Sequence, residues 1–485
     1  MQHIPQEEFL PAGDRFAPTQ TPHYASRSFA FHAWRRFRKN RSSVVAAWIL
    51  VALGLFALLA PMLSPYDVSS RDSDYTRALP KWKPLAFLGW DGCARRECMQ
   101  ASYDYYAAME VESGIPAVKK VLDRAVDPNT GALRYRLRID SYAQVGYRYL
   151  DISREEWENI RLYEQETGRQ VLYPMPRNYQ TAFVAVPGGA NLWYRLADES
   201  KYSSGLALEH DAEGNPIFTP DYLLDEAGQP VYGVENQTGY RVRALCSAYY
   251  RYQHGHDPLH PFGTDQHGRD IFVCLAYGAR LSFLLALAVS VINFFIGIVY
   301  GAVEGFYGGR VDLVMERLSD ILAAVPFIVV ATLFQLHLAQ RAGAVVSLLF
   351  AFVLTGWIGI ASRVRSQFYR FKNGEYVLAA RTLGASDRDL IFRHILPNAL
   401  GTVITATVLM IPGVIFSESM LSYLGIVNLE ASRLTSIGTM LSGGRAYLGS
   451  FPHILFFPAA FIALLQLSFH LVGNGLRDAL NPTLQ

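Results

Sequence analysis

Long apolar stretches alternate with polar segments along this 485-residue sequence. The hydrocarbon core of a bilayer is about 30 Å thick, so a helix that crosses it needs about 20 mostly apolar residues. Ser43 to Leu63 is one such stretch. Five more follow in the C-terminal half, at 279–303, 319–338, 343–361, 399–424 and 454–473. The pattern therefore predicts an all-α membrane protein with six transmembrane helices.

The first apolar stretch has two interpretations, a retained transmembrane helix or a secretory signal peptide, because basic residues precede both. Its flank, Trp34 to Arg41, is aromatic and cationic, as is typical of a membrane interface. The apolar run is long and lies deep in the chain, and 61–65 offers no small-residue cleavage site. These features favour a retained helix at 43–66, preceded by a cytoplasmic segment at 1–42.

Basic residues beside the apolar stretches predict the orientation, because short loops rich in lysine and arginine stay in the cytoplasm. The N-terminal flank carries Arg27, Arg35, Arg36, Arg38, Lys39 and Arg41. The segment after the fourth stretch carries Arg363, Arg365, Arg370, Lys372, Arg381, Arg388 and Arg393. Counting spans places both segments on the same side. We therefore expect both termini in the cytoplasm and residues 67–262 outside it.

Residues 67–262 contain no spanning stretch and have the size of an ordinary soluble domain. Turn signals at 127–131, 211–216 and 225–230 separate short apolar runs. Leu133 to Ile139 alternates apolar and basic residues, as a half-buried strand does, whereas Ser153 to Tyr163 has the pattern of a short helix. We expect an inserted α+β or mostly β domain, followed by a transmembrane core of five helices at 263–485.

Composition and charge agree with this division. The whole chain is 51% hydrophobic and only 18% charged, which excludes a disordered or nucleic-acid-binding chain. Residues 67–262 hold 22 basic and 27 acidic residues, a net charge of −5, whereas the rest of the chain has a net charge of +7. An acidic soluble block is therefore inserted into a basic, apolar frame.

The cysteines and histidines leave several interpretations open. The four cysteines are too few and too scattered for a disulfide scaffold or a zinc ribbon. Outside the cytoplasm a Cys93–Cys98 disulfide is chemically possible, and so are free thiols or a bond to Cys246. The histidines of 254–260, with Asp257, suggest a metal site or a solvated connector. Their Gly/Pro-rich setting favours the connector, and we predict no metal.

The segment from Glu375 to Asn398 carries the most specific pattern in the sequence. Its first part, Glu375 to Leu383, has the spacing of a short amphipathic helix, and Gly384 suits the left-handed conformation that ends a helix. Ser386 followed by Asp389 is a capping-box pattern for a second helix. Such a compact helix–turn–helix, joined directly to two spans, can pass a push from a soluble motor into the membrane.

Two further features of this segment concern its contacts and its end. Ala379 and Ala380 present little side-chain bulk, so another protein could approach the helix backbone closely. Pro397 lacks a backbone N–H and fits only the first turn of a helix. We therefore expect Pro397 to close the second short helix and to begin the fifth span.

The segment resembles the EAA loop of ABC-importer permeases, whose pattern is Glu-Ala-Ala, three residues, Gly, nine residues, Ile, any residue, Leu-Pro. The positions that match are Ala379, Ala380, Gly384, Leu396 and Pro397. The pattern's Glu is Leu378 here and its Ile is His394, and Glu375 lies one helical turn before Leu378. By resemblance, the residues that couple to an ATPase would be Glu375, Ala379, Ala380, Gly384, Ala385, Asp387, Leu396 and Pro397.

Other segments resemble the oligopeptide/dipeptide branch of these permeases, in particular its C-type subunit. They are 34–66, 261–282, 305–309, 393–398 and 475–482. The long insertion at 67–262 departs from that family, so its role is not implied by the resemblance. The resemblance implies the type I importer fold and a multi-pass protein of the bacterial inner membrane.

The resemblance also implies partners and cofactors. A second, homologous permease chain would complete the translocation pathway, two ABC ATPase subunits would supply the energy, and an extracytoplasmic binding protein would deliver peptide. The chain itself contains no Gly-x-x-x-x-Gly-Lys-Ser/Thr motif, so we expect it to be no enzyme and to bind no cofactor. ATP and Mg²⁺ would bind to the partner ATPases.

Charged residues near or within the spans have alternative roles. Asp265, Arg269 and Asp270 could form a gate at the outer mouth of the pathway, or a helix entry in which Asp265 caps the helix and pairs with Arg269. Glu418 lies inside the fifth span, where an ionisable residue suggests function. It could line the pathway or make structural hydrogen bonds.

Three other functions remain open. The same branch includes nickel permeases, so the cargo could be a metal complex. Residues 67–262 could be a receptor or enzyme displayed on a permease-derived anchor, although no catalytic spacing supports an enzyme. A passive channel is the third alternative, and it leaves the EAA-like segment without a purpose.

Overall fold

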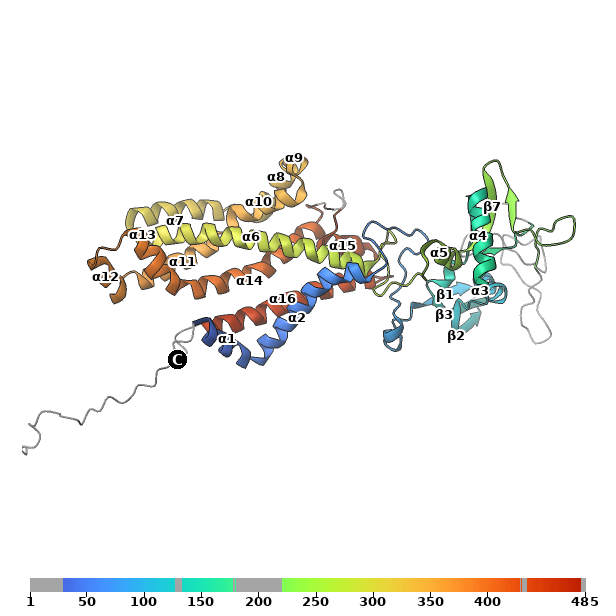
Figure 1. Ribbon diagram of the computed structural model, residues 1–485, viewed down its shortest axis with the longest axis horizontal. Coiled ribbons are helices and arrows are strands. Elements are labelled where there is room, and N and C mark those ends of the chain that lie inside the picture. Colours follow the sequence, from blue (N-terminus) through green and yellow to red (C-terminus); the bar gives the residue numbers. More distant parts are fainter. Residues whose placement is uncertain are drawn as a thin grey trace, which may run out of the picture.

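The computed structural model describes residues 29–126, 133–177, 179, 220–427, 429 and 434–480. A body of long helices forms one end of the molecule, and a domain that contains strands forms the other (Figure 1). The start of the described chain and the end of the last helix lie at the far end of the helical body, away from the strand-containing domain. The predicted fold class, a mostly helical protein with a strand-containing insertion, is confirmed, and the strands lie between residues 93 and 245.

Five helical segments of the described chain are long and apolar enough to cross a membrane. A bent pair makes a sixth if it counts as one span. All six overlap the stretches predicted from sequence. The five are α2 (Arg41–Leu63), α6 (Ile271–Tyr307), α10 and α11 together (Ala344–Gly356 and Ile358–Phe371), the run Asp387–Tyr423 that includes α14 (Leu396–Tyr423), and α16 (His453–Leu480).

The third predicted span is broken rather than continuous. It consists of α7 (Gly309–Ala323) and α8 (Phe327–His337), which meet at an angle of 71°. Pro326 lies at the start of α8 and cannot continue the hydrogen bonding of α7, because proline has no backbone N–H. The short helix α9 (Ala339–Ala342) then turns the chain into α10.

The fourth predicted span also differs in extent. The sequence predicts its end at residue 361, but α11 continues to Phe371. Arg363 and Arg365 therefore belong to a helix and not to a loop. Small residues allow α6 to pack closely on this helix: a Cβ atom added to Gly301 would overlap the carbonyl oxygen of Ala361.

The N-terminal helices pack against the last helix. A short helix, α1 (Phe29–Lys39), precedes α2, which begins after the N-cap residue Asn40. The Ser43 hydroxyl donates a 2.9 Å hydrogen bond to the carbonyl oxygen of Leu471 in α16. The first span is therefore an integral part of the helical body, as expected for a retained helix.

The inserted domain contains two antiparallel sheets. In the first, β1 (Cys93–Met99) and β2 (Val118–Val126) flank β3 (Leu133–Asp140), and α3 (Gln100–Ser113) packs on one face. In the second, β7 (Gly239–Leu245) pairs with β4 (Tyr147–Ser153), β5 (Leu172–Tyr173) and β6 (Gly233–Glu235). The helices α4 (Arg154–Thr167) and α5 (Cys246–His254) complete the domain.

Local predictions in this domain are confirmed where the structure describes them. Tyr135, Leu137 and Ile139 of β3 are buried while Arg134 and Arg136 between them are exposed. The predicted helix at Ser153 is α4, which Ser153 caps, and it extends four residues beyond Tyr163. The turn at 225–230 is closed by a 2.9 Å bond from the Asp225 N–H to the Gln229 carbonyl. The predicted turns at 127–131 and 211–216 lie outside the described residues.

The structure rules out a Cys93–Cys98 disulfide in this state. Both residues belong to the same extended strand, β1, and five residues of strand separate their Cα atoms by about 16 Å, far beyond the reach of a disulfide. All four cysteines are free thiols, and Cys246 is buried at the start of α5. Burial raises the pKa of the Cys93 and Cys98 thiols to about 11, so both are protonated at neutral pH.

Candidate coupling site

The EAA-like segment forms a bent element at the end of the helical body opposite the inserted domain (Figure 1). Its first helix is α12 (Glu375–Thr382), which follows α11 after a short turn. Its second part begins with α13 (Asp387–Asp389) and leads into α14. We call residues 375–398 the coupling elbow. The predicted two-part architecture is present, with both parts joined directly to long helices.

Gly384 ends the first helix in the way the sequence predicts. Its φ is +88°, in the left-handed region that glycine adopts without strain. The Ala385 N–H donates to the Ala380 carbonyl at 3.1 Å, and the Gly384 N–H donates to the Arg381 carbonyl at 3.0 Å. This pair of bonds is a Schellman motif, and Ala380 and Ala385 pack on the same core. The turn therefore has one well-defined geometry.

The second helix begins as predicted but does not end at Pro397. The Ser386 hydroxyl accepts a hydrogen bond from the Asp389 N–H at 3.2 Å, which caps the helix. The chain then forms a π-helical turn at Leu390–Ile395 and continues without a break into α14. Pro397 occupies the first turn of α14, as predicted, where a missing N–H is tolerated. The elbow is therefore attached rigidly to the fifth span.

One face of the coupling elbow is anchored in the helical body. Val377, Leu390, Ile391 and Ile395 are buried in a core that also contains residues of α6 and α11. Tyr376 and Asn398 add a 3.2 Å side-chain hydrogen bond between α12 and α14. Movement of α12 is thus coupled mechanically to three long helices.

The other face of the coupling elbow is exposed and carries both large apolar and charged side chains. Leu383, directly before the turn, is 88% exposed. Tyr376, Leu378 and Phe392 are exposed large apolar residues as well. Of the predicted coupling residues, Glu375, Ala379, Gly384, Asp387 and Pro397 are exposed, whereas Ala380, Ala385 and Leu396 are partly buried. We interpret these exposed large apolar residues as a candidate interaction surface.

An ion-pair cluster beside the elbow was not predicted from sequence. Arg365 of α11 binds both carboxylate oxygens of Asp312 (2.6 and 2.9 Å) and both of Glu316 (2.8 and 3.1 Å), on α7. Glu304 of α6 lies 3.6 Å from the same guanidinium. The charge of Glu316 is therefore compensated by Arg365. The neighbouring Arg317 pairs with Asp320 at 3.2 Å. Recognising α11 as a helix that continues past residue 361 would have shown Arg365 to be a candidate partner.

The predicted outer-mouth residues form part of a neck that joins the inserted domain to the helical body. The Asp265 carboxylate accepts bonds from the Arg269 side chain (2.7 Å) and from the backbone N–H groups of His267 and Arg269. Asp270, and not Asp265, caps α6 by accepting from the Val273 N–H at 2.8 Å. All three charged side chains are buried. These contacts favour the helix-entry interpretation over a gate.

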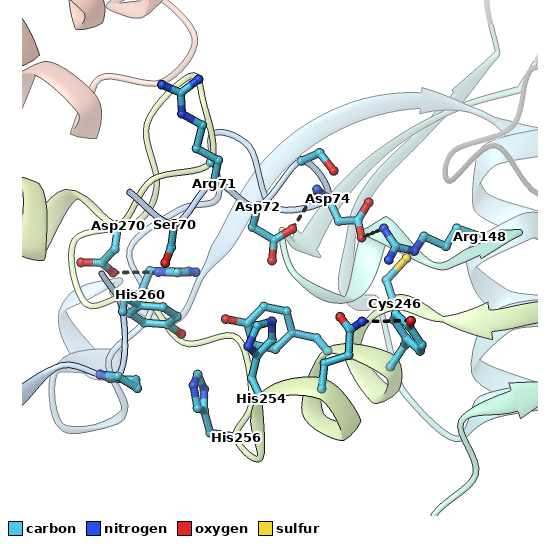
Figure 2. Close-up of a pocket in the computed structure, with 17 residues that line it drawn as sticks. Ser70, Arg71, Asp72, Asp74, Arg148, Cys246, His254, His256, His260 and Asp270 are labelled. Carbon is cyan, nitrogen blue, oxygen red and sulfur yellow. Dashed lines mark hydrogen bonds and ion pairs between the residues drawn. The ribbon is translucent and has the colours of Figure 1, made fainter. Parts of the chain in front are cut away.

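The histidine connector lines a polar cavity of about 270 Å³ in this neck (Figure 2). His260 is not solvated as the connector interpretation expects: it is buried, its Nδ1 lies 2.7 Å from an Asp270 carboxylate oxygen, and it stacks on Tyr66. His254 and His256 also line the cavity, with their ring centroids 6.1 Å apart. No set of three or more residues suited to a metal ion exists among the described residues.

Glu418 is enclosed and does not face open space within this chain. It is 1% exposed, and its carboxylate accepts hydrogen bonds from the hydroxyls of Ser282 (2.9 Å) and Ser422 (3.1 Å). The Ser282 bond connects α14 to α6, whereas Ser422 lies in α14 itself. The placement favours the structural hydrogen-bonding alternative over a lining of the pathway.

Comparison with known proteins identifies the family. The family model of the binding-protein-dependent transport system inner membrane component matches residues 293–485, and that of the N-terminal transmembrane domain of oligopeptide transport permease C matches residues 28–80. The oligopeptide transport system permease protein OppC of Bacillus subtilis is 45% identical over 226 residues, which cover 47% of this chain and 72% of that protein. The chain belongs to the oligopeptide/dipeptide branch of the binding-protein-dependent permeases.

A second relative agrees with this membership. The dipeptide transport system permease protein DppC of the same organism is 40% identical over 227 residues, 47% of this chain and 69% of that protein. Among solved structures, the MetNI methionine ABC transporter matches 43% of this permease and 96% of its own chain, with 16% identity and a TM-score of 0.35. Most of the inserted domain lies between the two family matches, so this permease carries a domain that neither family model includes.

Proposed function

We propose that this permease is one transmembrane subunit of an ATP-driven importer for oligopeptides or dipeptides. Its relatives are named oligopeptide and dipeptide transport permeases, and we assign the same class of cargo to this chain on that basis. A second, homologous permease chain would complete the translocation pathway. The observation that carries the proposal is the coupling elbow, which exposes apolar side chains on one face and is anchored to three long helices on the other.

We assign the energy source to partner subunits. Two ATPase subunits would bind ATP and Mg²⁺ and would dock on the exposed face of the elbow, since the sequence of this chain has no P-loop motif. The elbow and both termini would face the bacterial cytoplasm. The inserted domain would then lie outside the inner membrane, where an extracytoplasmic peptide-binding protein would deliver cargo. The placement of the elbow and the inserted domain at opposite ends of the helical body supports this orientation.

The geometry suggests how ATP hydrolysis would drive transport. Closure of the ATPase pair would push on α12 through Leu378, Leu383 and their neighbours. Because Gly384 fixes the turn and the second part of the elbow continues into α14, the displacement would be passed to the fifth span. The ion pairs of Arg365 would carry the same displacement from α11 to α7. The result would be a shift between inward- and outward-facing arrangements of the spans.

Affinity purification of the tagged full-length chain from native membranes tests this proposal. We expect a second multispanning chain and one or two P-loop ATPases to accompany it, as identified by mass spectrometry. Recovery of the chain alone, with the elbow cleaved readily by protease, would show that no ATPase subunit binds the elbow. That result would contradict the proposal. The displayed-domain interpretation would then be the better account.

A further inference from the structure

A groove in the helical body holds an arginine that the coupling mechanism does not use. The groove has a volume of about 510 Å³ and lies between α8, α10, α11 and α14. Its walls are mostly apolar, with Phe327, Phe352, Leu409 and Met410 among them. Arg363 of α11 is the one ionisable residue that lines it within the described part of the chain.

The groove follows the long axis of two antiparallel helices. On the α10–α11 wall the lining residues run from Phe352 to Arg363 at intervals of three and four residues, which is one face of a helix. On the α14 wall they run from Ala406 to Ser417 at the same intervals. At 1.5 Å per residue, each wall is about 16 Å long, roughly half the thickness of the hydrocarbon core. Arg363 lies at the end nearer the coupling elbow.

Small residues keep this groove open. A Cβ atom added to Gly359 or to Gly413 would meet no atom within 4 Å, so both glycines border empty space. Protein interfaces and interiors are close-packed, and a groove of this volume is suited to a transient ligand better than to a permanent protein contact. Substitution at either glycine can therefore fill the groove without a clash against the chain itself.

Arg363 carries a charge that nothing described in this chain neutralises. Its side chain is exposed, and no carboxylate, carbonyl or aromatic ring of the described residues partners it. Two other arginines of the long helices are compensated: Arg280 donates to the carbonyl oxygens of Ala57 and Leu58, and Arg365 binds two carboxylates. Arg363 belongs to a helical segment long and apolar enough to cross a membrane, and an ionisable residue of such a segment that faces a groove is a candidate for a substrate pathway.

The other end of the groove is polar but uncharged. Thr355 and Ser417 line it, and neither hydroxyl has a hydrogen-bond partner among the residues that the structure describes. The groove thus offers a cation at one end, hydroxyl groups at the other, and apolar walls between them. A short peptide presents the complementary set: a carboxylate, backbone amides and apolar side chains. A groove about 16 Å long holds four to five extended residues, because each spans about 3.3–3.6 Å.

We propose that Arg363 binds the C-terminal carboxylate of the peptide as it passes along this groove. The inference rests on the proposed peptide-import function and adds to it the residue that recognises a defined part of the cargo. A guanidinium binds a carboxylate through two parallel hydrogen bonds, which lysine cannot form in the same geometry.

The test uses the importer assembled with its partner subunits, purified and reconstituted into lipid vesicles. ATP-driven uptake is measured for a short apolar peptide with a free C-terminus and for the same peptide as its C-terminal amide. The variants are Arg363→Gln, Arg363→Lys and, as a matched control, Arg370→Gln, an exposed arginine of the same helix that lies outside the groove. The binding protein is common to all samples, so its own preference cancels when variants are compared.

We expect Arg363→Gln to lower uptake of the free peptide about 10- to 100-fold, the effect of one charge-assisted contact, and to leave uptake of the amide unchanged. Uptake of the free peptide by Arg363→Lys should lie between the values for Arg363→Gln and the wild type. Arg370→Gln should take up both peptides as the wild type does. Gly413→Leu, which fills the groove, should reduce uptake of both peptides while the complex stays assembled.

Two results would overturn the inference. Equal losses for the free peptide and the amide in Arg363→Gln, with loss of the second permease on purification, would assign Arg363 to a carboxylate of that chain. Unchanged uptake of both peptides would show that Arg363 does not meet the cargo. Failure of the wild type to take up either peptide would instead contradict the proposed function itself.

Discussion

The proposed coupling mechanism depends on the backbone angle of one residue, Gly384. A larger side chain at position 384 would not clash, because an added Cβ would meet no atom within 4 Å. The φ of +88° is what favours glycine there. A β-branched side chain in the left-handed region costs about 1–2 kcal/mol or more, so the turn of Gly384→Val should relax to another geometry. We expect ATP hydrolysis to continue while peptide uptake falls at least about tenfold, a loss of roughly 1.4 kcal/mol or more in coupling.

Two further variants make this prediction specific. Gly384→Asn should keep most uptake, because asparagine tolerates the left-handed region. Gly449→Val also points into open space, but its φ lies outside that region, and it should behave as the wild type. Wild-type uptake by Gly384→Val in the reconstituted importer would show that the turn geometry does not couple the motor to the spans.

Arg365 is the cation shared by three carboxylates of the helical body. Its removal leaves Asp312, Glu316 and Glu304 close together without their cation. For a cluster that is partly open to solvent we expect Arg365→Gln to cost roughly 1–3 kcal/mol, seen as a lower melting temperature of the purified protein in detergent. Arg317→Gln removes an exposed pair, worth about 0–1 kcal/mol, and is the matched control. Equal melting temperatures for the two variants would contradict the structural role of Arg365.

Residues that act through their nearest neighbours in sequence were predictable. Gly384 ends a helix and Ser386 begins one because of their own backbone and hydroxyl chemistry, which needs no tertiary information. Residues that act across the fold were not predictable. Arg365 meets Asp312 from 53 positions away, and His260 is buried against Tyr66, far along the chain. Such partners depend on how helices and neck segments pack.

At the scale of elements, α12 presents the surface on which the account depends. Leu383 and Leu378 are exposed large apolar residues, and an aspartate in place of Leu383 would put a charge into an apolar contact. We expect Leu383→Asp to reduce co-purification of the ATPases several-fold. Leu162→Asp alters another exposed leucine, in α4 of the inserted domain, and should leave the complex intact. Full retention of the ATPases by Leu383→Asp would place the dock elsewhere.

The helices show which features of the elements could be predicted from the sequence and which could not. Length and apolar content predicted all six hydrophobic segments, because crossing a bilayer imposes the same requirement on each. The bend at Pro326 and the π turn before Pro397 were not predicted. Both prolines break local hydrogen bonding, but only packing decides whether the helix ends, as at α7, or continues, as into α14.

At the scale of the whole molecule, two structurally different parts lie at opposite ends. The coupling elbow lies at one end, and the acidic inserted domain is held at the other by a neck of paired charges. A Cβ atom added to Gly268 would overlap the carbonyl oxygen of Asp72, so the two chain segments of the neck are in direct contact at this point. The composition of 67–262 predicted a separate domain, but its two sheets depend on strand pairings between distant residues.

ATP-driven peptide uptake is the most direct test of the central claim. The tagged permease would be purified with its partners from native membranes, reconstituted into lipid vesicles and supplied with ATP, the binding protein and a labelled dipeptide or oligopeptide. The account predicts accumulation that requires ATP hydrolysis and that is lost in Gly384→Val although hydrolysis continues. Vesicles that hydrolyse ATP with the wild-type permease yet accumulate no peptide, or that accumulate it without ATP, would contradict the account.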